Sequence, residues 1–224
     1  MAGRLQTLGG ILRRIENMKA ADYSYLALGD SYTIGEDVDF SDNFPSRLVS
    51  RIREETGMEG GRPGIIATTG WTTDELLAGI KEKNPAGPYQ MVSLLIGVNN
   101  QYRGYPREQY QREFGLLLQT AIDLAGGDAG RVLVIAIPDY GCTPYGAEKA
   151  QEINADLRWY NGEAAKQAAE KGIAFADIFP ESGLALYDPA LTASDRLHPS
   201  GLMYAKWVEK MLPLAIEILK KQKN

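Results

Sequence analysis

Short apolar runs alternate with longer stretches of helical period from Tyr23 onward. This alternation is typical of βαβ units, in which each helix crosses back over a parallel sheet. Five runs of four to six residues predict the strands, at Tyr23–Leu28, Gly64–Ala67, Met91–Ile96, Val132–Ile137 and Ile173–Ala176. The pattern therefore predicts an α/β protein with one five-stranded sheet.

The segments between these runs carry apolar residues at helical spacing. They predict helices over Phe44–Thr56 and Thr73–Lys83, around residues 110–125 and 153–164, and from about Pro199 onward. Pro213 lies inside the last of these, and we expect it to kink or end that helix because proline has no N–H to donate. No repeat, low-complexity tract or linker interrupts the pattern, so we expect residues 21–224 to form a single domain.

The first 20 residues differ from this pattern, and we expect them to form an N-terminal extension. Apolar residues recur there at helical spacing, which favours a short amphipathic helix that packs on the body or contacts a membrane surface: Leu5, Leu8, Leu12 and Ile15. Polar residues interrupt the apolar stretch that a signal peptide needs, namely Arg4, Gln6 and Thr7. A cytoplasmic location is the resulting expectation.

Composition narrows the function classes. The 224 residues suit one α/β domain, and 24 Lys plus Arg against 29 Asp plus Glu give a net charge of −5, which argues against nucleic acid as a partner. No apolar run approaches the ~18 residues that span a bilayer, so no transmembrane segment is expected. One cysteine, Cys142, and one histidine, His198, cannot assemble a Cys/His zinc site. We therefore expect no such zinc site.

Candidate chemistry lies in the segments that follow the strands. In open parallel sheets, ligands bind beyond the carboxyl ends of the strands. Three segments directly follow predicted strands and a fourth lies in the late loop before the last helix: residues 29–33, 68–71, 97–100 and 195–200. We expect these four segments to meet at one edge of the sheet.

Ser31, directly after the first strand, is a candidate nucleophile. A serine hydroxyl is unreactive until a base removes its proton, and His198 is the chain's only imidazole. Asp195, three residues earlier, is placed to orient that ring and stabilise its charged form. The sequence thus predicts a triad of Ser31, His198 and Asp195.

Attack on an ester creates an oxyanion, which needs preorganised hydrogen-bond donors. Gly70 and Asn99 follow the second and third strands and offer a backbone N–H and a side-chain amide. Each motif alone is ordinary turn or helix-cap chemistry. Their joint occurrence at one predicted sheet edge fills every role that acyl transfer requires.

These segments also resemble the SGNH hydrolases, or GDSL-type esterases and lipases. Gly29-Asp30-Ser31, Thr69-Gly70, Gly97-Val98-Asn99 and Asp195-Arg196-Leu197-His198 are similar, in order, to four blocks of that family. The resemblance implies a flavodoxin-like three-layer α/β/α sandwich with strand order 2-1-3-4-5. It implies ester hydrolysis without a metal or organic cofactor. It also implies that the Ser31 N–H joins the oxyanion hole. Tyr32 and Asn100 depart from the residues common in the family, which bears on substrate preference.

Loop lengths and aromatic residues bear on substrate preference. We find no long insertion that resembles a lid, so an open, shallow site for short-chain or soluble esters is expected. Aromatic residues near the strand ends are candidate pocket residues and suit a sugar ring or an acyl chain: Tyr32, Trp71, Tyr102, Tyr105 and Tyr140. Alternatives with the same triad are a carbohydrate O-acetylesterase, a lysophospholipase, a thioesterase or an acyltransferase. A catalytically silent ligand-binding domain is the alternative from another class.

Overall fold

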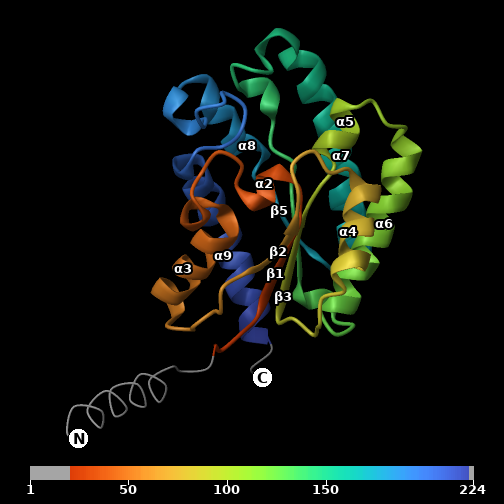
Figure 1. Ribbon diagram of the computed structural model, residues 1–224, viewed down its shortest axis with the longest axis vertical. Coiled ribbons are helices and arrows are strands. Elements are labelled where there is room, and N and C mark those ends of the chain that lie inside the picture. The colour runs from red at the N-terminus through yellow and green to blue at the C-terminus, as the bar shows by residue number, and fades with distance from the viewer. Residues whose placement is uncertain (1–20, 222–224) are drawn as a thin grey trace, which may run out of the picture.

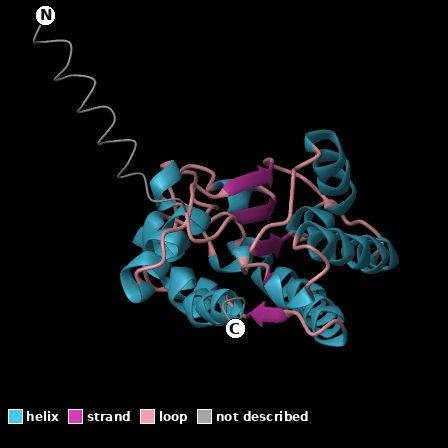
Figure 2. Cartoon of the chain, turned by 90° about the horizontal axis from the view of Figure 1, so that it is seen from below, coloured by secondary structure: helices cyan, strands magenta, loops and turns pink. Residues whose placement is uncertain are grey.

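The computed structural model describes residues 21–221 and contains a parallel sheet between two layers of helices (Figure 1 and Figure 2). Its strands are β1 (Tyr25–Gly29), β2 (Gly64–Ala67), β3 (Met91–Leu95), β4 (Val132–Ile135) and β5 (Ala174–Ala176). Every neighbouring pair is parallel, in the order β2-β1-β3-β4-β5. The predicted fold class and strand order are therefore confirmed.

Long helices cover both faces of the sheet (Figure 1). One layer holds α3 (Phe44–Thr56) and α9 (Gly201–Lys221), and the other holds α4 (Thr73–Lys83), α6 (Arg107–Leu124) and α7 (Ala150–Glu170). Short helices follow β1, β3 and β5: α2 (Ser31–Ile34), α5 (Val98–Tyr102) and α8 (Phe179–Ser182). Single 3-10 turns lie at η1 (Phe40–Asp42), η2 (Ala129–Arg131), η3 (Tyr140–Cys142), η4 (Ala147–Lys149), η5 (Gly183–Leu186) and η6 (Pro189–Leu191).

The core lies where the central strands meet both helical layers. Every residue of β1, β3 and β4 is buried, whereas β2 and β5 at the two edges are partly buried. Continuous apolar strands are expected when helices cover both faces of a parallel sheet. The carboxyl ends of the strands all point to one end of the molecule, the upper end in Figure 1.

Local capping sets the helix boundaries that the sequence predicts best. The Asn43 side chain accepts the Ser46 N–H at 3.0 Å at the start of α3, and Gly57 ends this helix in the left-handed conformation. At the start of α4, Thr72 and Glu75 form a capping box. Both helices match their predicted bounds residue for residue.

Helix α9 runs through Pro213, so of the two expected effects, a kink or an end, the helix does not end there. Proline removes one helical hydrogen bond, the one to the carbonyl four residues earlier, at Glu209. Pro213 and Glu209 are both exposed, so water can satisfy that carbonyl. Packing of the opposite side of α9, where Tyr204 and Trp207 are fully buried, maintains the helix.

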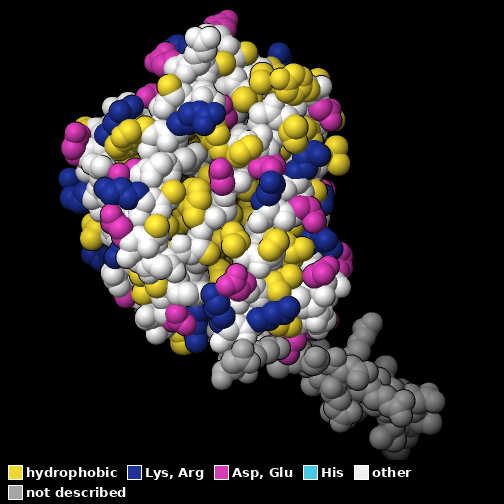
Figure 3. All heavy atoms as spheres, turned by 180° about the vertical axis from the view of Figure 1, so that it is seen from behind, with side chains coloured by type: hydrophobic (Ala, Val, Ile, Leu, Met, Phe, Trp, Pro, Cys, Tyr) yellow, Lys and Arg dark blue, Asp and Glu magenta, His cyan; other side chains and the backbone are white. Residues whose placement is uncertain are grey.

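The expected N-terminal extension lies outside the described residues. No helix among residues 21–221 is both long and apolar enough to cross a membrane. On the face seen in Figure 3, acidic and basic side chains are interspersed.

Candidate active site

Ser31 lies at the carboxyl end of β1, as the first residue of α2. The Asp30 side chain caps this helix by accepting the Tyr32 N–H at 3.1 Å. Only glycine fits at position 29, because a Cβ there would lie 2.1 Å from Thr33 Oγ1 and 2.4 Å from the Leu95 carbonyl. The tight strand-to-helix turn thus places Ser31 just beyond the end of β1.

His198 and Asp195 lie in the loop between η6 and α9. His198 Nδ1 is hydrogen-bonded to Asp195 Oδ2, while Asp195 Oδ1 accepts the His198 N–H and the Leu197 N–H, each at 2.9 Å. Partial burial raises the Asp195 pKa, but these hydrogen bonds outweigh it and hold the pKa below its usual range. The carboxylate therefore stays ionised and orients the ring through Nδ1, which leaves Nε2 for another partner.

Asp37 holds this loop from outside, a role that the sequence did not reveal. Its Oδ2 accepts the Asp195 N–H at 2.9 Å and the Ser194 hydroxyl at 2.6 Å. Both Asp37 (φ 61°) and Arg196 (φ 66°) adopt the left-handed conformation, which costs free energy for a residue with a Cβ. The loop after α2 and the loop before α9 are thus joined across the sheet edge.

Three donors face the same region from three strand ends. The N–H groups of Ser31 and Gly70 donate to no acceptor in the described part of the chain. Asn99, in α5, uses one N–H of its amide to donate to the Trp71 carbonyl at 3.0 Å, which leaves its second N–H available. Together they can receive one negatively charged oxygen.

Arg103 holds the turn that contains Gly70. Gly70 has φ +84°, where a side chain would be strained, and its carbonyl accepts Arg103 Nη2 at 2.5 Å. Arg103 also pairs with Glu75 of α4 at 3.3 Å. Arg103 therefore ties the turn after β2 to α4, and nothing in the sequence pattern pointed to it.

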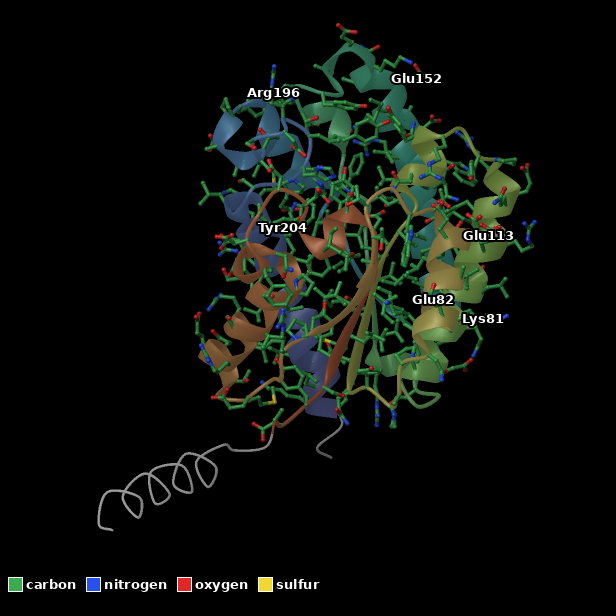
Figure 4. The ribbon with its side chains drawn as sticks, viewed as in Figure 1. Lys81, Glu82, Glu113, Glu152, Arg196 and Tyr204 are labelled. Carbon is green, nitrogen blue, oxygen red and sulfur yellow. The ribbon has the colours of Figure 1, made fainter. Side chains whose placement is uncertain are left out.

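Asn100, next to Asn99, anchors α5 in the protein interior. Its Oδ1 accepts the Thr73 N–H at 3.1 Å, and its Nδ2 donates to Thr73 Oγ1 at 2.8 Å. Thr73 Oγ1 in turn donates to Glu113 Oε2 of α6 at 2.6 Å; Figure 4 labels Glu113. All three side chains are buried. This chain fixes the helix that presents Asn99.

A hollow of about 160 Å³ brings the predicted reactive groups together. It is lined by Ser31, Gly70, Asn99 and His198, with Asp195 behind the imidazole, and by Tyr32, Thr69, Val98, Tyr102, Tyr140, Tyr145 and Leu197. Tyr32, Tyr102 and Tyr140 thus line the hollow as the sequence predicts. Trp71 instead packs over Gly79, and Tyr105 lies beside Arg103.

Tyr145 lines the hollow although the sequence did not single it out. It comes from the irregular stretch after β4, more than three residues beyond the strand end. Its hydroxyl lies 2.7 Å from that of Tyr102. A search confined to the residues directly after each strand could not find it.

Two buried side chains lie beneath the reactive groups. The Tyr32 ring meets the His198 ring edge-on, with centroids 5.7 Å apart, and supports it from below.

Burial raises the pKa of Asp30 from 3.8 to about 7, against hydrogen bonds from backbone N–H groups that lower it. Asp30 Oδ2 has no hydrogen-bond partner in the described structure, so Asp30 carries its proton more readily than an exposed carboxyl.

Among the candidate reactive groups, a serine side chain is the one suited to attack an acyl group. Among residues 21–221, no group of three or more His, Cys, Asp or Glu side chains is placed to hold a metal ion. Burial and the neighbouring Asp139 raise the pKa of the Cys142 thiol to about 12, so this cysteine is not an activated nucleophile. Ser31, which lines the hollow, therefore remains the candidate nucleophile.

In this three-layer sandwich, Ser31 and His198 line one hollow at the carboxyl ends of the strands, an arrangement that suits a serine ester hydrolase. The model of the GDSL-like lipase/acylhydrolase family matches residues 27–206. The chain belongs to this family and is a carboxylic ester hydrolase, which confirms the resemblance seen in the sequence. No curated protein matches it.

Several solved structures share the fold. Axe2, an acetylxylan esterase from Geobacillus stearothermophilus, is 18% identical with a TM-score of 0.69, over 87% of this chain and 94% of that chain. TesA is 22% identical with a TM-score of 0.61, over 85% and 97%. Lip_vut3, a lipase from a goat rumen metagenome, is 19% identical with a TM-score of 0.66, over 87% and 98%. At these identities the likeness concerns the fold.

Proposed function

We propose that this serine esterase hydrolyses esters of short acyl groups and soluble alcohols, with Ser31, His198 and Asp195 as its triad. The observation that carries the proposal is the shared hollow, which Ser31, His198, Gly70 and Asn99 all line. Asp195 lies directly behind the imidazole, hydrogen-bonded to Nδ1. These are the groups that nucleophilic acyl transfer requires.

In the first half-reaction, His198 Nε2 takes the proton of the Ser31 hydroxyl while Oγ bonds to the carbonyl carbon of the ester. The carbonyl π electrons move to oxygen, and the N–H groups of Ser31, Gly70 and Asn99 stabilise the resulting anion. When this intermediate collapses, the bond from carbon to the alcohol oxygen breaks. The alcohol leaves with the proton held by His198, and the acyl group stays on Ser31.

In the second half-reaction, His198 removes a proton from water as the water oxygen attacks the acyl carbon. The same donors hold the second oxyanion. Collapse breaks the bond to Oγ, Ser31 recovers its proton from His198, and the carboxylic acid is released. The ionised Asp195 stabilises the imidazolium in both halves without taking the proton itself.

Size supports a short acyl group. The hollow of about 160 Å³ is smaller than the ~300–1,000 Å³ of typical small-molecule sites. Tyr32 and Tyr140 form part of its wall, and both are buried, so they cannot swing aside without exposing the core. An acetyl-sized group fits beside Ser31, whereas a fatty chain would lie outside the hollow.

Labelling by a fluorophosphonate probe tests the nucleophile. We expect stoichiometric labelling of the wild-type protein and none of Ser31→Ala. Ser50→Ala, an exposed serine on α3, is the matched control and should label fully. Equal labelling of the wild type and Ser31→Ala would contradict the assignment, and absence of labelling and of turnover in the wild type would indicate a silent binding domain.

A chain-length series tests the acyl preference. With p-nitrophenyl esters from acetate to laurate, we expect kcat/KM to be highest for acetate to butyrate and to fall for longer chains. A maximum at octanoate or beyond would contradict the short-acyl assignment while leaving the triad intact.

A further inference from the structure

A second and larger hollow adjoins the catalytic one. Its volume is about 460 Å³, and it shares three wall residues with the catalytic hollow: Tyr102, Tyr140 and Tyr145. This volume lies within the ~300–1,000 Å³ range of small-molecule sites. A substrate whose ester carbonyl lies at Ser31 therefore has room to continue past the tyrosines.

Tyr145 joins the two sides of the boundary between the hollows. Its hydroxyl is hydrogen-bonded to that of Tyr102 at 2.7 Å, and Tyr102 belongs to α5, the helix that carries Asn99. Its backbone N–H donates to the Arg196 carbonyl at 3.2 Å, in the loop that carries His198. The second hollow is thus fixed to both the oxyanion side and the base side of the catalytic one.

The wall of the second hollow offers aromatic surface at its entrance. The side chains of Tyr102 and Tyr145 are 58% and 53% exposed, although aromatic rings usually bury most of their area. Their ring centroids lie 6.5 Å apart, and that of Tyr140 lies 6.4 Å from Tyr102. Such rings give a flat ligand a surface to stack on, with hydroxyls at their edges.

Another part of the wall is polar, and its groups are paired with one another. Asp156 pairs with Arg107 at 3.0 Å and accepts a hydrogen bond from Gln101 at 3.3 Å. Gln101 also accepts the Tyr140 hydroxyl at 2.8 Å. Donors and acceptors therefore alternate along this wall, which does not suit the hydrocarbon chain of a fatty acyl group.

Three charged side chains complete the lining: Glu148, Lys149 and Glu152, from η4 and the first turn of α7. None of them forms an ion pair with another residue in the described part of the chain. Figure 4 shows Glu152 at the same end of the molecule as Arg196 of the catalytic loop. Two free carboxylates against one ammonium leave the lining with a net negative charge, which disfavours an anionic ligand.

We propose that this second hollow binds the alcohol half of the ester, and that this alcohol is a neutral polyhydroxylated molecule such as a sugar. The inference rests on the proposed function, because the catalytic hollow must hold the acyl half. A sugar ring presents C–H groups to the tyrosine faces, and each of its hydroxyls can both donate and accept along the alternating polar wall. Anionic alcohols and thiols, such as phosphate-bearing carriers, meet unpaired carboxylates there.

Substrates that share one acyl group and differ in the alcohol test this proposal. We would measure kcat/KM for acetylated methyl xyloside, acetylcholine, acetyl-coenzyme A and p-nitrophenyl acetate, for the wild type and two variants. Glu152→Trp fills the second hollow with a large side chain. Gln151→Trp is the matched control, since the neighbouring Gln151 is exposed on the same helix and lies outside the hollow's lining.

We expect the wild type to prefer the acetylated xyloside over acetylcholine and acetyl-coenzyme A by at least tenfold. Glu152→Trp should lower the ratio of xyloside to p-nitrophenyl acetate turnover at least tenfold, and Gln151→Trp should leave it within twofold. A wild-type preference for the choline or coenzyme ester, or an unchanged ratio in Glu152→Trp, would overturn the assignment while leaving the serine esterase in place. Absence of turnover with every acetyl ester would instead refute both proposals.

Discussion

Asp37 Oδ2 accepts the backbone N–H of Asp195 at 2.9 Å, which joins the loop after α2 to the loop that carries His198. The two residues are 158 positions apart in sequence. The same oxygen accepts the Ser194 hydroxyl at 2.6 Å. The relation of Ser31 to His198 therefore depends on a contact between two exposed loops.

Removal of this contact should weaken catalysis more than folding. We expect Asp37→Ala to lower kcat/KM about tenfold, since a hydrogen bond to a charged group contributes roughly 1.5–3 kcal/mol, less when exposed. Asp37→Asn keeps an acceptor and tolerates the left-handed backbone, so it should restore most of the activity. Steady-state kinetics with p-nitrophenyl acetate measures both. Equal activity of Asp37→Ala and the wild type would show that the contact does not position the loop.

The Asn99 amide should contribute to the rate more than to binding. Loss of one oxyanion donor typically lowers kcat by ~10²–10³. We expect Asn99→Ala to show a decrease of that size with KM changed less than threefold. Because Asn99 also donates to Trp71, a thermal melt should accompany the kinetics. A decrease below fivefold in a well-folded variant would remove Asn99 from the oxyanion hole.

The buried Asn100 side chain should be sensitive to a change of one atom. In Asn100→Asp the side chain can no longer donate to Thr73 Oγ1, and it places a second carboxylate near Glu113. We expect a loss of about 1–3 kcal/mol in the free energy of unfolding at neutral pH. Asn84→Asp makes the same charge change at an exposed position and should cost far less.

This cost should shrink in acid, where a protonated carboxyl can donate again. Chemical denaturation at pH 5 and pH 8 would measure the difference. An equal cost at both pH values, or an equal cost at positions 84 and 100, would argue against the hydrogen-bonded chain through Thr73.

Activity should fall on the acid side through one ionisation. A protonated His198 cannot accept the Ser31 proton, so kcat/KM should fall as the pH is lowered from 8 to 5. The hydrogen bonds that lower the Asp195 pKa keep this carboxylate ionised through the same range, so it adds no second step there. The measurement is kcat/KM against pH, and a flat profile from pH 5 to 8 would exclude His198 as the base.

Asp30 should make the protein less stable as the pH rises. Its pKa in the folded state, about 7, lies above the 3.8 of an exposed carboxyl, so between these values the folded state binds the proton more tightly. The stability that Asp30 contributes is present in acid and is lost as the pH rises through that window. Asp30→Asn keeps an acceptor for the Tyr32 N–H and has no such loss.

We therefore expect the Tm of Asp30→Asn, relative to wild type, to increase by at least about 3 °C between pH 5 and pH 8. Thermal melts at the two pH values measure this directly. A relative Tm that stays constant would mean that Asp30 is ionised, or protonated, at both.

The sequence determined the alternation of strands and helices, because burial on both faces of a parallel sheet demands apolar runs and because caps such as Asn43 and Thr72 are local. It also placed Ser31, Gly70, Asn99 and His198 at strand ends or in the loop before the last helix, and parallel strands bring such positions to one edge. Pro213 does not end its helix, since a proline on an exposed helical face can leave the unpaired carbonyl four residues earlier to water.

Only the tertiary structure decided what surrounds the reactive groups. Asp37, Arg103 and Tyr145 act through contacts with residues far away in sequence, and their residue types are common in loops, so no local pattern marks them. The second hollow likewise exists only where α5, η4 and α7 meet. Its shape and charge arise from side chains brought together by packing, which is why periodicity and motif spacing could not predict it.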